Sequence, residues 1–133
     1  MPINFNYNDN VMIILGTSAK DNHDIIKSAD PNDWWLHMDS IPSGHVIIKS
    51  KSLKNMNDIT NSYNILNFAS EKCFNGLQLN KRNKFIHSNS AFFYVTISQV
   101  KNIILTENIG EVEFINEGKN KLRNVPIKLN LTF

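Results

Sequence analysis

Residues 30–38 of the chain read DPNDWWLHM, and residues 41–48 read IPSGHVII. The first run places aromatic and apolar side chains after a Pro-Asn-Asp start, so Trp34–Met38 is predicted to be a strand. The second run is rich in β-branched residues and predicts a strand over 45–49. Residues 39–44 between them have the composition of a turn. We therefore expect two strands that can pair as a hairpin.

The rest of the chain predicts further strands and two helices. The β-branched run Val11–Leu15 ends at Gly16 and predicts a buried strand. Asp21 or Asn22 offers an N-cap to a short helix over 23–27. Apolar residues near a 3.6-residue period predict one long helix, and β-branched or aromatic runs predict the remaining strands. These are a helix over 58–74 that stops at Gly76, and strands over 91–97, 100–105, 111–115 and 125–131.

Blocks of strands with one substantial helix predict an α+β fold. We expect a mainly antiparallel sheet, with the long helix packed on one face and the short helix near the N-terminus. A chain of 133 residues has the size of one ordinary domain, so residues 1–133 are expected to form a single domain. The polar residues 1–10 are expected to be loose.

Basic side chains gather at three places in a chain whose net charge is only +2. The low net charge excludes a nonspecific polycation. Separate clusters can still converge into one basic stripe that contacts phosphates, although scattered solvated lysines would have the same composition. The clusters are Lys49, Lys51 and Lys54; Lys81, Arg82 and Lys84; and Lys119, Lys121, Arg123 and Lys128.

The cysteine and apolar patterns exclude several classes of protein. Cys73 is the only cysteine, so neither a disulfide framework nor a multi-cysteine zinc site is expected. No apolar run approaches the roughly 20 residues of a membrane span, and the start of the chain lacks the pattern of a secretory signal. We expect a cytoplasmic protein without a cofactor, in which the Cys73 thiol is an inert core group.

The adjacent residues Trp34 and Trp35 must point to opposite faces, because side chains alternate along a strand. One indole is therefore expected in the core, and the other can serve as a stacking platform for a base. If the two strands pair, His37 and His45 approach one another near the turn, and Asp33 shares the face of His37. Such a set can bind a divalent metal, perform acid–base chemistry on a phosphodiester, or simply hold the turn by hydrogen bonds. No metal or nucleophile motif separates these alternatives.

The residues from 14 to 49 resemble the NFACT-R domain, the RNA-binding domain of ribosome-quality-control and fibronectin-binding-like proteins. The family pattern is a strand, a loop with Gly, Lys and Asn, a Pro-x-Asp-x-Trp-Leu-His run, and a turn that ends in His-Val. The order and spacing match without gaps. The matching residues are Gly16, Lys20, Asn22, Pro31, Asp33, Trp35, Leu36, His37, Pro42, Ser43, Gly44, His45 and Val46.

The second half of the chain resembles the family more loosely. Residues 68–70 fall in its Ala-rich helix, and residues 94–96, 100–101 and 110–112 fall in its later strand and turn motifs. Ile109 replaces the usual proline. The resemblance covers nearly the whole chain and identifies it as a stand-alone member, for which a virus or a cellular parasite is one conceivable source.

The resemblance implies an RNA-binding adaptor that acts in translation or ribosome quality control and contacts tRNA or rRNA without catalysis. The ribosome or translation factors are further partners that it implies. Asp33, Trp35 and His37 would share the functional face, and Trp34 with Leu36 would lie in the core. The implied roles are phosphate neutralisation by Lys20, Lys49 and Lys101, hydrogen bonds from Asn22, Asp33 and Ser43, base stacking by Trp35 and His37, and stabilisation of the turn by His45.

Two alternatives belong to other classes of function. One is a metal-assisted nuclease or phosphodiesterase centred on Asp33, His37 and His45. The other is a protein-interaction module that docks on a translation factor, which would leave RNA affinity weak and only mildly dependent on salt.

Overall fold

The computed structural model describes residues 1–39, 41–77, 82 and 92–128. Within these residues the fold is α+β, as predicted, with a mainly antiparallel arrangement of strands. The elements in chain order are β1 (Ile3–Asn8), β2 (Val11–Leu15), α1 (Ala19–Lys27), β3 (Trp34–Met38), β4 (Val46–Ser50), α2 (Met56–Asn61), α3 (Tyr63–Asn75), β5 (Phe92–Gln99), the 3-10 helix η1 (Val100–Asn102), β6 (Ile103–Leu105), β7 (Val112–Phe114), the 3-10 helix η2 (Ile115–Gly118) and β8 (Lys121–Lys128).

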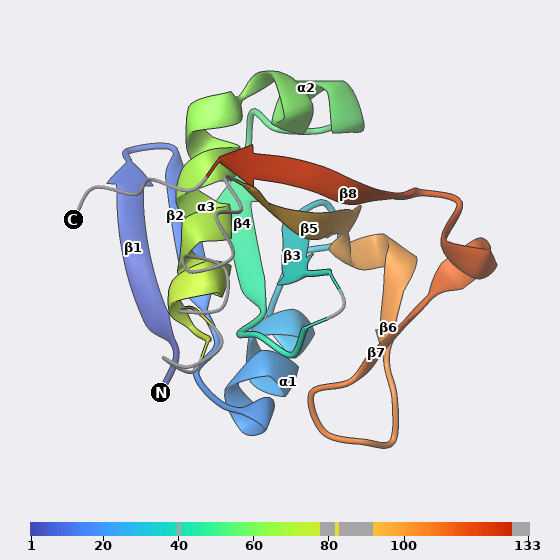
Figure 1. Cartoon of the computed structure of the whole chain (residues 1–133). Helices are drawn as coiled ribbons and strands as arrows, with labels where there is room; N and C mark the ends of the chain where they lie inside the picture. The colour runs from blue at the N-terminus through green and yellow to red at the C-terminus, as the bar shows by residue number, and fades with distance from the viewer. Residues whose placement is uncertain (40, 78–81, 83–91, 129–133) are drawn as a thin grey trace.

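A six-stranded sheet in the order β1-β2-β4-β3-β5-β8 forms the centre of the fold, and β6 and β7 pair separately (Figure 1). The predicted strand Trp34–Met38 is confirmed as β3, and the next strand begins at Val46, one residue later than predicted. The two strands pair antiparallel, with Trp34 opposite Ile48 and Leu36 opposite Val46. The motif-bearing segments therefore occupy the middle of the sheet, where both faces can be covered.

The helices α2 and α3 cover one face of the sheet. The predicted helix over 58–74 is two helices, because the chain leaves helical geometry at Ser62, which has φ −96° and ψ 60°. The Ser62 hydroxyl donates to the Asp58 carbonyl at 2.9 Å, which is the local competition with helix bonding that serine provides. The end of α3 at Gly76 is as predicted. Leu66, Ala69 and Cys73 of α3 pack on this face with Trp34 and Leu36, among others.

The short helix α1 and the β6–β7 hairpin cover the opposite face. They enclose a second cluster of Ile25, Ile26, Trp35, Ile47 and Ile103. The helix begins earlier than predicted, because the Ser18 side chain caps it by accepting from the Asp21 N–H at 3.1 Å. The proposed caps Asp21 and Asn22 lie inside the first turns and are buried.

The N-terminal segment differs from the loose region that we expected for residues 1–10. Residues 3–8 form β1 and pair antiparallel with β2. The physical reason is alternation: Phe5 and Tyr7 point to one face, where both rings pack edge-on against Phe68 of α3. Asn4, Asn6 and Asn8 alternate with these rings, so they point to the other face and remain exposed.

The strands of the second half are shifted from their predicted bounds. The predicted strand over 100–105 begins with η1 and is a strand only from Ile103, and the strand predicted over 125–131 begins at Lys121. Residues 129–131 of that prediction lie outside the described residues. A bulge interrupts the β5–β8 pairing, where Asn124 has φ 55° and its N–H donates to the Asp39 carboxylate at 2.8 Å. None of the helices in the described part of the chain combines the length and apolar character of a membrane span.

Candidate nucleic-acid interface

The structure distributes the predicted site residues over two ends of the sheet. Asp33, Lys49 and Lys101 lie where β3 begins and β4 and β5 end. Lys20, Asn22, His37, Ser43 and His45 lie toward the other end, near the start of α1 and the β3–β4 loop. Trp35 lies between the two groups. The nine residues therefore do not form one continuous site.

One basic cluster and the first lysines of another meet at the first end. Pairing places Ser50 opposite Val11, Trp34 opposite Gln99, and Ser98 opposite Lys121, so the end of β4 and the start of β8 lie at the same end of the sheet. We call this surface the basic end. Its lysines are Lys49, Lys51, Lys54, Lys101, Lys119 and Lys121. Of the other cluster, Lys81 and Lys84 fall outside the described residues.

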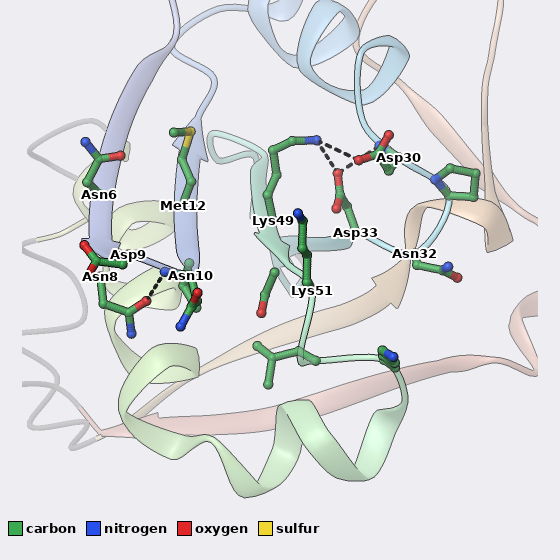
Figure 2. A pocket seen from close by; sticks show the side chains of 15 residues that line it. Asn6, Asn8, Asp9, Asn10, Met12, Asp30, Asn32, Asp33, Lys49 and Lys51 are labelled. Carbon is green, nitrogen blue, oxygen red and sulfur yellow. Dashed lines mark hydrogen bonds and ion pairs between the residues drawn. The ribbon is translucent and has the colours of Figure 1, made fainter.

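The basic end contains a hollow of about 970 Å³. Figure 2 shows Lys49 and Lys51 between two sets of polar side chains, one from the β1–β2 turn and one from residues 30–33 before β3. Asparagine amides can donate and accept hydrogen bonds, so this lining is able to contact the sugar, phosphate or base edges of a nucleic acid. The asparagines that line the hollow are Asn6, Asn8, Asn10 and Asn32.

Lys49 is held in place by two aspartates. Its ammonium group lies 2.5 Å from the Asp33 carboxylate and 3.6 Å from that of Asp30 (Figure 2). Burial lowers the pKa of Lys49, but the hydrogen bond and charge of Asp33 outweigh it and raise the pKa above its usual value. Asp33 is buried and also accepts from the Asp30 N–H at 2.8 Å. Both contacts are made by Oδ2 of Asp33, whose role here is to position Lys49.

The other lysines of the basic end have no acidic partner among the described residues. The Lys101 ammonium donates to the Asn32 side-chain oxygen at 3.3 Å, and Lys121 lies 3.9 Å from the centre of the Phe114 ring. Lys51, Lys54 and Lys119 are exposed without such contacts. Because no acidic side chain among the described residues pairs with them, their charges are available to phosphates.

Trp35 is not the exposed stacking platform that we predicted, because only 3% of it is accessible. It does lie on the face opposite Trp34, which is in the core as predicted. The β6–β7 hairpin covers the indole, and the Phe114 ring packs edge-on against it at 5.7 Å. The strands of this hairpin are short and weakly patterned, so their folding back over Trp35 could not be predicted from the sequence.

Trp35 joins the two histidines in one aromatic cluster. His37 stacks on the indole with ring centres 5.8 Å apart, and His45 meets His37 at 4.9 Å, so the predicted approach of the histidines is confirmed. The indole N–H donates to Nδ1 of His45 at 3.1 Å, which requires a neutral imidazole with its proton on Nε2. Burial and, to a smaller extent, the nearby His37 lower the pKa of His45 to about 3. Burial also lowers the pKa of His37.

Asp33, His37 and His45 do not converge on a common point. Asp33 is paired with Lys49 at the basic end, whereas the histidines lie toward the other end. Among the described residues, no three His, Cys, Asp or Glu side chains are grouped so that they could hold a metal ion. The geometry that the nuclease alternative needs is therefore not present in this set. The Cys73 thiol is buried, and burial raises its pKa.

The other end of the sheet contains a smaller hollow of about 590 Å³, near the start of α1. Asn22 and Ser43 line it, and their side-chain oxygens are already bonded: Oδ1 of Asn22 accepts from the His45 N–H at 3.1 Å, and the Ser43 hydroxyl accepts from the Met38 N–H at 3.2 Å. A β-carbon on Gly44 would lie 2.6 Å from the Gly16 carbonyl oxygen, so the two loops pack as only glycine allows. The matched glycines and polar residues therefore stabilise the junction of these loops.

The sequence analysis did not identify the asparagines of the hollow. An available signal was the alternation of residues 3–8, in which asparagine occupies every second position. This pattern indicates a strand with one polar face. Four further lysines were predicted as members of the basic clusters but not as site residues: Lys51, Lys54, Lys119 and Lys121.

Comparison with known proteins gives a family and a fold. The model of the NFACT protein RNA binding domain matches residues 1–114. The solved structure of the C-terminal part of the fibronectin/fibrinogen-binding protein from Streptococcus suis is similar, with a TM-score of 0.60 and 18% sequence identity. The similarity covers 95% of this chain and 48% of that one, so the chain spans about half of its length. A comparison with curated proteins gives no match.

Proposed function

The chain belongs to the NFACT protein RNA binding domain family, and we propose that it is an RNA-binding adaptor that contacts tRNA or rRNA through the basic end. Its place of action is translation or ribosome-associated quality control in the cytoplasm, and it contributes binding without a reaction of its own. The ribosome or a translation factor is the partner to which the bound RNA would be presented.

The observation that carries this proposal is the convergence of lysines from two distant segments on one end of the sheet. Residues 49–54 and 101–121 both contribute to it, and only Lys49 is paired with acidic groups among the described residues. Three lysines and three aspartates line the hollow itself, so the excess of positive charge at the basic end comes from Lys101, Lys119 and Lys121 beyond this lining. Phosphate contacts of this kind position a protein on a nucleic acid without reading its sequence, as an adaptor requires.

Two observations support binding rather than catalysis. The pKa values of the half-buried His37 and the buried His45 are both lowered, and the ring of His45 already accepts the Trp35 N–H. A general acid near neutral pH needs a pKa close to the working pH, which is far above the value of about 3 for His45.

A charge-reversal experiment tests the proposal. We expect Lys51→Glu combined with Lys101→Glu to weaken tRNA binding by at least about tenfold per lysine, since a hydrogen bond to a charged group contributes about 1.5–3 kcal/mol. Lys20→Glu is the matched control, because Lys20 is also exposed but lies at the other end of the sheet. Gel-shift titration with tRNA and with an rRNA fragment gives the affinities.

Three results would contradict parts of the proposal. Equal affinities for the double variant and the wild type would exclude the basic end as the interface. A loss of binding in Lys20→Glu alone would assign the interface to the other end of the sheet. Cleavage of the labelled RNA by the wild type in Mg²⁺ or Mn²⁺ would show an enzyme instead of an adaptor.

A further inference from the structure

Exposed aromatic side chains of β5 lie on a part of the sheet that the basic end does not include. Phe93, Val95 and Ile97 point into the core beneath α3, so alternation directs Phe92 and Tyr94 to the opposite face. The β6–β7 hairpin covers Trp35 on that face but leaves Tyr94 47% exposed and Phe92 42% exposed. Aromatic side chains of this size are usually buried, which makes their exposure informative.

The neighbouring strand β8 places a proline and a cation beside these rings. Pro126 lies directly opposite Tyr94, and Lys128 lies directly opposite Phe92. Paired residues on adjacent strands share a face, with β-carbons about 5 Å apart. We call Phe92, Tyr94, Pro126 and Lys128 the β5–β8 platform.

Within the two strands every charged side chain is positive, and the Asp39 carboxylate that contacts them is engaged by the Thr96 hydroxyl and the Asn124 N–H. Neither β5 nor β8 contains an acidic residue, whereas β8 contributes Lys121, Arg123 and Lys128. Accessible rings beside cations are the combination with which proteins bind single-stranded nucleic acids: the rings stack on bases, and the cations neutralise phosphates. The platform is less suited to an apolar protein surface, because Lys128 interrupts its apolar area.

We propose that the β5–β8 platform binds an unpaired segment of RNA, with a base stacked on Tyr94 and a phosphate at Lys128. This inference rests on the proposed RNA-binding function and adds a second surface to it. The family match over residues 1–114 includes Phe92 and Tyr94 but not Pro126 and Lys128. Because β8 begins at the basic end and runs to the platform, one RNA lying along β8 contacts Lys121 and Lys128 in turn.

The test compares two RNA probes and one aromatic side chain at a time. The probes are a 12-nucleotide oligouridine and a blunt 20-base-pair RNA duplex. We expect Tyr94→Ala to weaken oligouridine binding by about 5- to 150-fold, the range for one stacked base, and to leave duplex binding unchanged. Tyr63→Ala is the matched control, because Tyr63 is 50% exposed on α3, the helix over the other face.

A second variant keeps the proposal falsifiable if Tyr94→Ala affects folding. Tyr94→Trp retains a stacking ring and should retain oligouridine affinity. Stacking of a base should quench the fluorescence of the new indole. The change can be assigned to residue 94 because Trp34 and Trp35 are both buried. The proposal is overturned if Tyr94→Ala binds oligouridine as tightly as Tyr63→Ala does, or if the RNA leaves the emission of Tyr94→Trp unchanged. Loss of both probes in the lysine variants, with no effect at Tyr94, would keep the proposed function and reject the platform.

Discussion

The indole of Trp35 lies on the face of β3 that the family resemblance assigns to RNA, yet its surroundings make it a core residue. Phe114 covers the ring, His37 stacks on it, and the indole N–H donates to His45. A residue that matches a family motif can therefore be required for packing. Here the indole is needed for a buried hydrogen bond, which only an indole or a similar donor can provide.

Substitution of Trp35 measures this role. We expect Trp35→Ala to lower the free energy of unfolding by about 3–5 kcal/mol, as for other large core aromatics. Trp35→Phe keeps most of the ring but leaves His45 Nδ1 without its donor, at a cost of about 1–3 kcal/mol. Urea denaturation gives both values. A wild-type stability for Trp35→Ala, together with reduced RNA affinity, would restore the stacking role that the sequence predicts.

The acid sensitivity of His45 is a second consequence at the residue scale. Its pKa is about 3 in the folded protein and about 6.5 in an unfolded chain, so the unfolded state binds a proton that the folded state does not. Its contribution to stability is complete above pH 6.5 and is lost as the pH falls toward 3. Between pH 6.5 and 5 we expect a loss of about 1–2 kcal/mol from this group, measured by urea titration. His45→Asn should flatten this dependence, and a wild-type stability that is constant over the interval would contradict it.

At the scale of elements, the sequence predicts correctly the strands that have a strong local pattern. The strands Val11–Leu15 and Trp34–Met38 were predicted with their observed bounds, because dense β-branched and aromatic residues bounded by glycine, proline or aspartate are unambiguous. The long helix was wrong at Ser62, where a hydroxyl bond to the preceding turn competes with the helix. β1 was missed although the alternation of residues 3–8 indicates a strand; what the sequence does not show is that its rings pack on Phe68.

The candidate site was less predictable than the strands. The approach of His37 and His45 follows from pairing two adjacent strands, and the sequence predicts it correctly. The convergence of residues 49–54 with residues 119–121 depends on the order of strands in the sheet, which no local pattern encodes. The pairing of Asp33 with Lys49, in contrast, follows from the predicted pairing of β3 with β4, because Asp33 precedes Trp34 and Lys49 follows its partner Ile48.

At the scale of the whole molecule, a small net charge conceals a strong asymmetry. The chain carries a net charge of only +2, but one basic cluster and the first lysines of another share one end of the sheet. Among the described residues, the other end contains the loops that pack through Gly16 and Gly44, together with the exposed lysine Lys20 at the start of α1. A polyanion therefore meets an oriented field, which favours association at the basic end even though the protein is nearly neutral.

The salt dependence of RNA binding measures how much of the affinity this asymmetry supplies. Five lysines of the basic end have no acidic partner among the described residues, and we expect about three to five of the cations there to contact phosphates. Each contact adds about 0.7 to the slope of log affinity against log salt on a single strand, so the slope should be about −2 to −3.5. Affinity for an unstructured RNA should then fall roughly 20- to 130-fold between 50 and 200 mM salt.

Replacing Lys51 and Lys101 by alanine removes two contacts and should reduce the slope by about 1.4, whereas Lys20→Ala should not change it. An affinity that stays constant over this range of salt would mean that the lysines do not contact phosphates, and would favour docking on a protein through uncharged surface.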